Sequence, residues 1–404
     1  MNSKKVLYCL VLCLVFYNFR AWFFIAGSNI NWGFILGGLI YLLTLINFRL
    51  LSLSPVKIAF ILLSAFCYIY NSTTFNLGGI AGTFLNLSAL YVILLLKIVH
   101  RIELVNIFDK IMYYVTIVSV AGWILYLARV PLPYFNFTWQ ASVDSFYIFK
   151  CYYIFLYWDR GAISDVFPRF SSIFYEPGYY AIILVFLILY HRFDFHKRQV
   201  IVYTVALVLS FSLAGYLMFF IMWIGLNLLK DKRGLLKLIL IIVFINGFYS
   251  FFKNYNGGNN PVNEMVLVRM EFVDGEWSGY NRTRETFDDM FDNFVRDGGN
   301  NFVWGVDRTR FQRNVDLGNV GWKVYLYKNG FVCFLAFILC VLIPYLPYKN
   351  KIVCILPLLL FILMFARGHL VIWYSGYWLL YIGCLYKCSL INNTETKTNA
   401  KEYM

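Results

Sequence analysis

The sequence predicts an all-α integral membrane protein with about twelve transmembrane helices. The chain has 404 residues, of which 61% are hydrophobic and 14% charged. Soluble globular domains are closer to half apolar and a quarter charged. Apolar stretches recur along the chain at lengths near the ~20 residues that cross a bilayer. The cations also gather at alternate ends of these stretches, so we expect a single integral membrane domain over 1–404.

The apolar stretches give the expected spans. Two of them, 199–212 and 214–229, are short and follow each other closely, which tilt and local thinning of the bilayer can accommodate. The full set is 6–27, 32–48, 56–71, 78–98, 111–129, 173–191, 199–212, 214–229, 234–252, 322–346, 352–366 and 370–386. The N-terminal stretch resembles a signal peptide but lacks a small-residue cleavage site, so it is interpreted as the first span.

The cations predict which ends of the spans face the cytoplasm. Short segments at alternate ends carry Lys4, Lys5, Arg49, Lys57, Lys97, Arg101, Lys110, Arg192, Lys197, Arg198, Lys230, Lys232, Arg233, Lys237, Lys349, Lys351, Lys387, Lys397 and Lys401. The first two turns on the other side carry none. This is the positive-inside pattern, and it places both termini in the cytoplasm. It also accounts for much of the net charge of +14 without a nucleic-acid partner.

Two long segments are expected outside the membrane, a first outer loop at 130–172 and a large outer loop at 253–321. From Arg129 onward the outer cations are mostly arginine, whereas the inner cations are mostly lysine. Arginine holds phosphate or carboxylate through two parallel hydrogen bonds. The arginine bias therefore favours an anionic ligand on the outer face. The alternative is that these arginines pair with acidic residues of the same loops or with lipid headgroups.

The stretch "PRFSSIFYEPGYY" places ionisable residues where a span begins. Arg169, Ser172, Glu176 and Tyr180 share one face if the segment is helical. Pro177 suits the first helical position, with Glu176 as the cap before it. A helix over 177–191 is only about 22 Å long, too short for ~30 Å of hydrocarbon. We therefore expect 170–176 to enter the membrane as irregular backbone, which is tolerated only inside protein or beside a wet cavity. An interfacial cap with a snorkelling arginine is the alternative.

The large outer loop contains an amphipathic helix within "YNRTRETFDDMFDNFVRDGG". Its apolar positions follow helical spacing at Phe287, Met290, Phe291 and Phe294. We expect this helix to lie on the membrane or to cap a cavity. Thr283 or Asn281 is the expected cap, which puts Arg282 and Arg284 beside the helix N-terminus, a natural anion site. The alternative is that both arginines are solvated charges.

The sequence contains no recognisable nucleotide, metal or hydrolase motif. It has no phosphate-binding GxxxxGK[ST], no HExxH and no GxSxG. Its nine cysteines and four histidines show no metal-ligand spacing. We expect neither a metal nor a cofactor.

The layout resembles the O-antigen and capsular polysaccharide polymerases and the related O-antigen ligases. The similarity consists of "R-F-S-S-I-F-Y-E-P-G-Y-Y-A" entering one span, "N-R-T" in a large outer loop, and "G-N-V-G-W-K-V-Y-L-Y-K-N-G" entering another. Its topology extends over nearly the whole chain, and its motifs cover about 168–181 and 279–330. The residues that match the loose motif of the family are Arg169, Ser172, Phe174, Glu176, Pro177 and Ala181.

The resemblance implies a metal-independent glycosyltransferase of C-type-like fold in the bacterial plasma membrane. Its donor and acceptor would be undecaprenyl-diphosphate-linked glycans on the outer face, and a chain-length regulator and a flippase would be its partners. Arg169 matches the first diphosphate-binding arginine of the family. Arg282 is the better match for the second, with Arg284 as its rival.

Two departures from the family pattern bear on the choice between polymerase and ligase. The ligases usually have a histidine about eleven residues before the glycine that corresponds to Gly330, and Asn319 stands there. This difference favours a polymerase. The family usually has a Gly-x-Gly motif before this position, and here Gly305 is the only glycine of that motif.

The remaining site residues are expected from their positions. Glu176 is the best-placed general base, and His369 near Arg367 is a weaker one. Tyr179, Tyr180 and Trp322 are candidates for stacking on sugars, with simple packing as the alternative for each ring. Ser172, Asn319 and Arg367 complete the expected substrate contacts. A ligase, a lipid-linked oligosaccharide flippase and a membrane acyltransferase remain as alternatives. A flippase normally needs internal repeats and inner-cavity charges, and Arg20 is the main charge expected within a span.

Overall fold

The computed structural model is mostly helical, and its contacts divide the chain into two compact units that we describe separately. The structure describes residues 3–26, 31–71, 77–142, 145–159, 169–230, 247, 249–258, 260, 263, 267, 272–273, 276–277, 285–306, 321–349, 351–368 and 373–390. Unit 1 comprises Met1–Asn18, Asn31–Val105 and Asn281–Leu385, and unit 2 comprises Phe19–Ile30, Asn106–Tyr280 and Tyr386–Met404.

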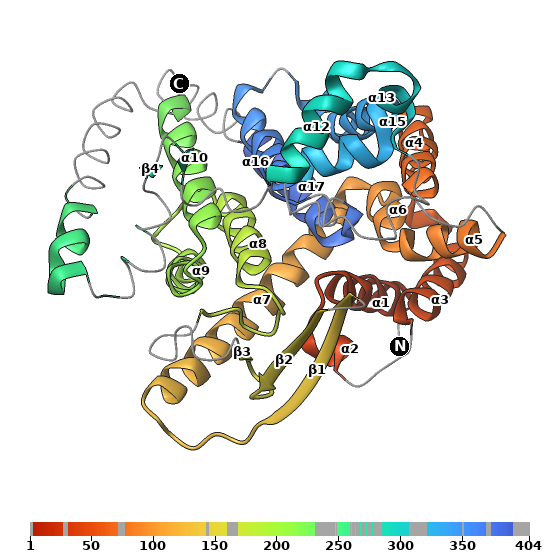
Figure 1. The fold of residues 1–404 in the computed structure, drawn as a ribbon. Coiled ribbons are helices and arrows are strands. Elements are labelled where there is room, and N and C mark those ends of the chain that lie inside the picture. The colour runs from red at the N-terminus through yellow and green to blue at the C-terminus, as the bar shows by residue number, and fades with distance from the viewer. Residues whose placement is uncertain are drawn as a thin grey trace, which may run out of the picture. The chain divides into compact units, whose positions relative to one another are not determined.

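Unit 1 is built from helices of both halves of the sequence (Figure 1). These are α1 (Ser3–Asn18), α3 (Trp32–Ile46), α4 (Pro55–Asn71), α5 (Leu77–Asn86), α6 (Ser88–Leu95), the start of α7 (Ile98–Leu127), α12 (Glu285–Asp297), α13 (Gly299–Trp304), α15 (Gly321–Tyr345), α16 (Ile355–Arg367) and most of α17 (Ser375–Ser389). Short 3₁₀ turns occupy Phe48–Leu50, Leu346–Tyr348 and Ile352–Cys354. Helix α1 packs on α3, and α15 packs on α4 and α16.

Unit 2 combines helices with a small sheet. Its elements are α2 (Trp22–Ile25), the rest of α7, β1 (Phe135–Ser142), β2 (Ser145–Cys151), β3 (Leu156–Asp159), α8 (Pro177–Tyr190), α9 (Arg198–Leu209), α10 (Leu213–Lys230), the 3₁₀ turn Tyr255–Gly258, β4 (Phe272–Val273) and β5 (Glu276–Trp277). Helix α8 packs against both α9 and α10. Strands β1, β2 and β3 form an antiparallel sheet in that order, and β4 pairs with β5.

The sheet corrects the all-α prediction. Residues 135–159 lie in the first outer loop, 130–172, for which no strand was predicted. Alternate side chains of β1, namely Phe135, Phe137 and Trp139, pack on a cluster that contains Phe149 and Leu156. This period of two is the pattern of a strand with one buried face.

Fewer of the described helices than expected are long enough to span a membrane, and most of the expected span 234–252 lies outside the described residues. Among the described residues, α7 and the segment Gly321–Tyr348 are long and apolar enough to cross a membrane. The pair Gly78–Asn86 and Ser88–Leu95, bent by 49°, makes a third candidate if it counts as one span. Six other apolar helices have 10–17 residues. Two to three candidates therefore replace the predicted twelve, and α7 runs as one helix through the inner loop expected after residue 98.

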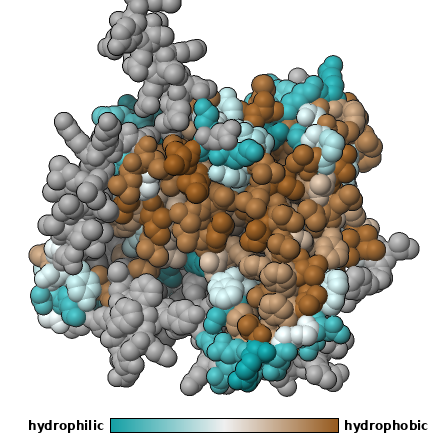
Figure 2. All heavy atoms as spheres, turned by 90° about the horizontal axis from the view of Figure 1, so that it is seen from above, coloured by the Kyte–Doolittle hydropathy of each residue, from teal (hydrophilic) through white to brown (hydrophobic). Residues whose placement is uncertain are grey.

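Large apolar side chains are nevertheless exposed on many of these helices. Leu45, Ile46 and Leu62 of unit 1 are 71%, 70% and 64% exposed. Figure 2 shows apolar residues covering much of the described surface on one face. Soluble monomers rarely expose large contiguous apolar patches. This surface, with the candidate spans, is consistent with a helical membrane protein.

In unit 1, the backbone of α15 approaches the end of α13 closely at a break within α15. Helix α15 is interrupted at Gly330, whose φ is +75°. A Cβ there would lie 2.4 Å from both Gly305 N and Val303 O. The N–H of Val306 also donates to the carbonyl of Tyr327 at 3.0 Å. Only a residue without a side chain fits this junction between the end of α13 and α15.

Candidate functional site

The irregular segment 169–176 of unit 2 is the centre of the candidate site. Helix α8 begins at Pro177, and Glu176 occupies the cap position with extended φ and ψ, as the sequence predicts. The Glu176 side chain makes no capping hydrogen bond, but its carbonyl accepts from the N–H of Tyr180 at 3.2 Å. Residues 169–176 themselves form no helix. This agrees with the irregular backbone expected for 170–176, so Arg169, Ser172 and Glu176 do not share a helical face.

Backbone hydrogen bonds hold this segment on three sides. Phe170 N–H donates to Leu209 O at the end of α9, at 3.0 Å. The carbonyl of Ser172 accepts from Leu156 N–H at 2.8 Å, at the start of β3. The carbonyl of Ile173 accepts from the N–H of Trp22 at 3.0 Å. Buried backbone needs such partners when it leaves regular structure, and they fix the position of the segment.

The inner face of the segment is buried. Ser172 is fully buried in the left-handed region, with φ of 52°, and its hydroxyl lies 2.8 Å from that of Ser119 on α7. Phe174 stacks on Tyr180 with ring centroids 5.5 Å apart. Thus irregular backbone enclosed in protein precedes α8. This is the arrangement that permits non-helical chain at membrane depth.

Tyr180 and Ser172 are placed for packing rather than for contact with sugars. Tyr180 is fully buried, and its hydroxyl lies 2.9 Å from that of Thr116. Its ring also packs against Phe170. Both side chains therefore lack the surface that a bound glycan would need, and this corrects their expected role as substrate contacts.

Arg169 and Glu176 stand at the two ends of the segment and are both partly exposed. The Nε–H of Arg169 donates to the carbonyl of Ser210 at 3.1 Å, in the turn between α9 and α10. One Arg side chain carries five N–H donors in a planar fork. The hydrogen bond to Ser210 orients the guanidinium group and uses one of its five N–H donors.

The sequence did not predict a cationic and aromatic group that includes Tyr175, the residue before Glu176. Arg20, expected within a span, follows the end of α1 with φ of 55°. Its guanidinium carbon lies 4.9 Å from the Trp139 ring centroid and 5.9 Å from that of Tyr175. The two rings lie 5.2 Å apart. Cation–π attraction of this kind holds the arginine at the end of the buried segment. The charge of Arg20 was visible in the sequence, but the end of α1 was not.

Among the described residues of unit 1, Trp322 and Arg367 belong to the expected site. Trp322, at the start of α15, is 37% exposed and packs edge-on against Phe291 of α12. Arg367 occupies the last turn of α16. A Cβ at Gly321 would lie 2.1 Å from Phe365 O, so the start of α15 and the end of α16 touch at their backbones. Trp322 and Arg367 therefore both lie beside the contact between the start of α15 and the end of α16.

Helix α12 is confirmed as amphipathic, but its apolar face is not free. Phe287, Phe291 and Phe294 are buried against Val324, Leu326 and Tyr327 of α15. Lys323 Nζ lies 2.6 Å from Asp288 Oδ1 across the same contact. The expectation that this face lies on the membrane is therefore wrong, since α15 already covers it (Figure 1).

Several expected site residues lie outside the described part of the chain. These are Arg282, Arg284, Asn319 and His369, with the capping positions Asn281 and Thr283. Within the described residues, no group of three or more His, Cys, Asp or Glu side chains is placed to hold a metal ion.

Comparison of the chain with models of protein families, with curated proteins and with solved structures finds no match.

Proposed function

We propose that the protein is a membrane glycosyltransferase that polymerises undecaprenyl-diphosphate-linked oligosaccharide repeat units. The product would be O-antigen or capsular polysaccharide, made on the outer face of the bacterial plasma membrane. One observation carries the proposal: irregular backbone with a buried inner face enters α8 with Arg169 at one end and Glu176 at the other. An ionisable residue at membrane depth is by default a functional-site hypothesis.

The topology that we propose retains both termini in the cytoplasm. Helix α8 has 14 residues, or about 21 Å at 1.5 Å per residue. Residues 170–176, together with α8, would complete a crossing of about 30 Å. Similar additions of irregular chain to the other short apolar helices would give more crossings than helix length alone indicates. The C-type-like fold is part of the same proposal.

The reaction that we propose is transfer of a glycan from its diphosphate carrier. A hydroxyl at the non-reducing end of one glycan attacks the anomeric carbon of the other. The new glycosidic bond forms as the bond from that carbon to the diphosphate oxygen breaks. Glu176 accepts the hydroxyl proton, and Arg169 with Arg282 or Arg284 stabilises the negative charge on the departing diphosphate.

Arg20, Trp139 and Tyr175 add to this proposal. The aromatic rings of Trp139 and Tyr175 offer apolar surface on which sugar rings can stack, and Tyr175 directly precedes Glu176 in the chain. Arg20 supplies a second cation in unit 2, in contact with both rings. We assign it to glycan or diphosphate binding within the same reaction.

Deletion of the gene followed by gel analysis of surface glycans tests the proposal. A polymerase mutant shows a single repeat unit on its carrier or core. Lipid-linked polymer in the mutant would instead indicate a ligase, and a complete lack of surface repeat would indicate a flippase. Long chains that persist unchanged would contradict all three.

Point variants test the assignment of residues in the same strain. Arg169→Ala and Arg282→Ala should each reproduce the deletion, because loss of one transition-state donor lowers rates by roughly 10²–10³-fold. Glu176→Gln should do the same while keeping the shape of the side chain. Arg296→Ala is the matched control, because Arg296 is an exposed outer arginine in the last turn of α12. Normal chain length in both arginine variants, with the protein present in the membrane, would remove the diphosphate-binding role.

A further inference from the structure

A cavity of about 560 Å³ lies in unit 2, away from the segment 169–176. The turn between α8 and α9 forms one part of its lining, the C-terminal half of α10 another, and Lys387 of α17 a third. The lining residues are Tyr190, His191, Arg192, Phe193, Asp194, Lys197, Trp223, Leu226, Asn227 and Lys387. Its volume is within the ~300–1,000 Å³ typical of small-ligand sites. In the topology proposed above, all these residues lie at the cytoplasmic ends of helices.

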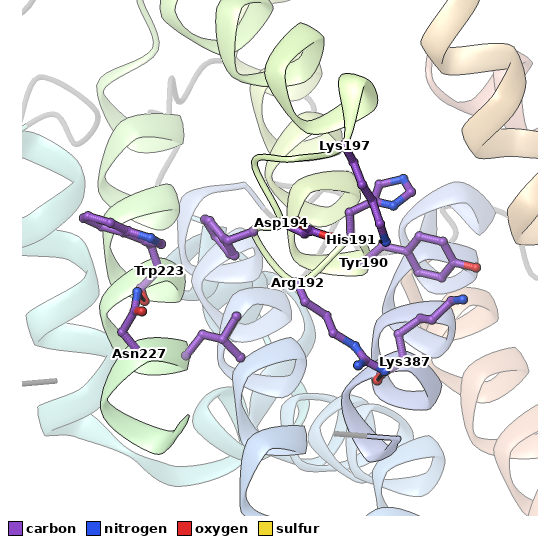
Figure 3. A pocket seen from close by; sticks show the side chains of 10 residues that line it. Tyr190, His191, Arg192, Asp194, Lys197, Trp223, Asn227 and Lys387 are labelled. Atoms are coloured by element: carbon purple, nitrogen blue, oxygen red, sulfur yellow. Dashed lines mark hydrogen bonds and ion pairs between the residues drawn. The ribbon is translucent and has the colours of Figure 1, made fainter. Parts of the chain in front are cut away.

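Three cationic residues, Arg192, Lys197 and Lys387, line this cavity. Arg192 extends from the turn toward Lys387, and Trp223 and Asn227 project from α10 (Figure 3). The Nη2 of Arg192 donates to the backbone carbonyl of Lys387 at 2.7 Å. Lys387 Nζ lies 5.1 Å from the centroid of the Tyr190 ring. These contacts orient both side chains without neutralising either charge.

One acidic residue, Asp194, lines the same cavity. Its carboxylate lies 3.8 Å from Lys197 Nζ and accepts from the N–H of His196 at 3.2 Å. The Asp194 and Lys197 side chains are 39% and 48% exposed, so solvent screens this pair. Burial, Arg192 and Lys197 together lower the pKa of Lys387, while Asp109 raises it. The cavity is therefore a region of net positive potential.

The turn that carries Arg192 is held in a fixed conformation. Arg192 and Phe193 both have left-handed φ, 59° and 55°, which non-glycine residues rarely adopt. Their N–H groups donate to Leu189 O at 2.8 Å and to Ile188 O at 3.0 Å. Such a turn persists only where contacts with the surrounding residues hold it in place.

Hydrogen bonds among the largely buried side chains of His191, Asp109 and Tyr203 hold the turn in place. His191 Nε2 lies 3.0 Å from both carboxylate oxygens of Asp109 on α7. The hydroxyl of Tyr203 on α9 donates to Asp109 Oδ1 at 2.8 Å. The His191 and Asp109 side chains are 12% and 11% exposed. Asp109 thus ties the turn and α9 to α7, and it positions Arg192 before any ligand arrives.

We propose that this cavity binds a phosphate group through Arg192, Lys197 and Lys387. A guanidinium and two ammonium groups around one cavity suit a phosphate, which accepts several hydrogen bonds at once. Trp223 is the kind of residue that sits at headgroup depth in membrane proteins. The phosphate comes either from an anionic lipid headgroup or from a free phosphate compound. This site is separate from the glycan reaction, and its test does not depend on that reaction.

The neighbouring cations Lys197 and Arg198 provide a matched pair of variants that tests phosphate binding in the cavity. Lys197 lines the cavity, whereas Arg198 is exposed and does not. Purified full-length protein in detergent is titrated with short-chain phosphatidylglycerol, with phosphatidylcholine of the same chain length, and with inorganic phosphate. Binding is measured as the shift in the midpoint of thermal unfolding, because a ligand that binds the folded state raises it.

We expect phosphatidylglycerol, inorganic phosphate or both to raise the midpoint, and phosphatidylcholine to raise it less. A response to phosphatidylglycerol alone identifies a lipid site, and a response to inorganic phosphate identifies a site open to free phosphates. Lys197→Gln should weaken the apparent affinity about threefold, as for a half-exposed ion pair. Arg192→Gln should weaken it by about tenfold or more, and Arg198→Gln should leave it unchanged. Equal weakening by Lys197→Gln and Arg198→Gln, or no response to either anionic probe, would overturn the proposal.

Discussion

Replacing Gly330 with alanine should destabilise unit 1 far more than the same replacement at Gly299. Both glycines have positive φ, +75° and +68°. A Cβ at Gly330 would lie 2.4 Å from Gly305 N and from Val303 O, whereas a Cβ at Gly299 meets nothing within 4 Å. Gly299→Ala therefore measures the backbone strain alone, and Gly330→Ala measures that strain plus the close approach.

The magnitudes follow from these two terms. A left-handed conformation costs an alanine about 1–2 kcal/mol. Forcing extra atoms into a packed junction costs a further ~1–3 kcal/mol, and here the obstructing atoms are backbone and cannot rotate away. We expect Gly330→Ala to lower the free energy of unfolding by about 2–5 kcal/mol, against about 1–2 kcal/mol for Gly299→Ala.

The assay is titration of the purified protein from mild detergent into sodium dodecyl sulfate, followed by helical circular dichroism. Both variants are compared with the unaltered protein in the same detergent. The unfolding midpoint of Gly330→Ala should fall clearly below that of Gly299→Ala. Equal midpoints for the two variants would refute the close approach of α13 and α15.

Three further predictions concern packing and the site. Phe287→Ala should cost about 3–5 kcal/mol in the same unfolding titration, because Phe287 is fully buried against α15, whereas Val295→Ala, at a 47% exposed position, should cost little. Small losses of similar size for Phe287→Ala and Val295→Ala would mean that the apolar face of α12 faces lipid. Asp109→Leu should cost about 1–3 kcal/mol by leaving His191 without its hydrogen-bond partner. Asp109→Asn should cost less because its oxygen still accepts from Tyr203, and losses of equal size would contradict the bonding described. Arg20→Ala should shorten surface glycan chains without changing the amount of protein in the membrane, and unchanged chain length on gels would exclude Arg20 from the site.

The start of α8 was predictable from sequence because local chemistry determines it. Proline fixes its own φ and lacks an N–H, so Pro177 marks a first helical position and Glu176 the residue before it. The length argument then required irregular chain before the helix, and the structure has it. Arg169 and Ser172 share no helical face with Glu176, because the helix begins only after them.

The end of α1 and the neighbours of Arg20 were not predictable in this way. Residues 19–26, which follow Asn18, contain no glycine or proline and are apolar except for Arg20. The turn depends instead on long-range pairing of Ala21 with Phe174 and on the rings of Trp139 and Tyr175. Contacts between residues so far apart in the sequence carry no local signal.

The two remaining differences have different causes. The alternation of Phe135, Phe137 and Trp139 with polar residues was a visible strand signal in a segment interpreted as a loop. The amphipathic pattern of α12, in contrast, predicts an apolar face but does not identify what covers it. Phe291 packs on protein here, and a lipid surface would have required the same pattern.

The most direct test of the central claim is polymerisation by the purified protein. The protein in detergent or lipid is supplied with a chemically defined undecaprenyl-diphosphate-linked repeat unit and no metal ion. The account predicts a ladder of glycans longer than one repeat, with release of undecaprenyl diphosphate, and loss of both in Arg169→Ala but not in Arg296→Ala. Substrate that remains as single repeats with the unaltered protein, or an equal ladder from Arg169→Ala, would contradict it.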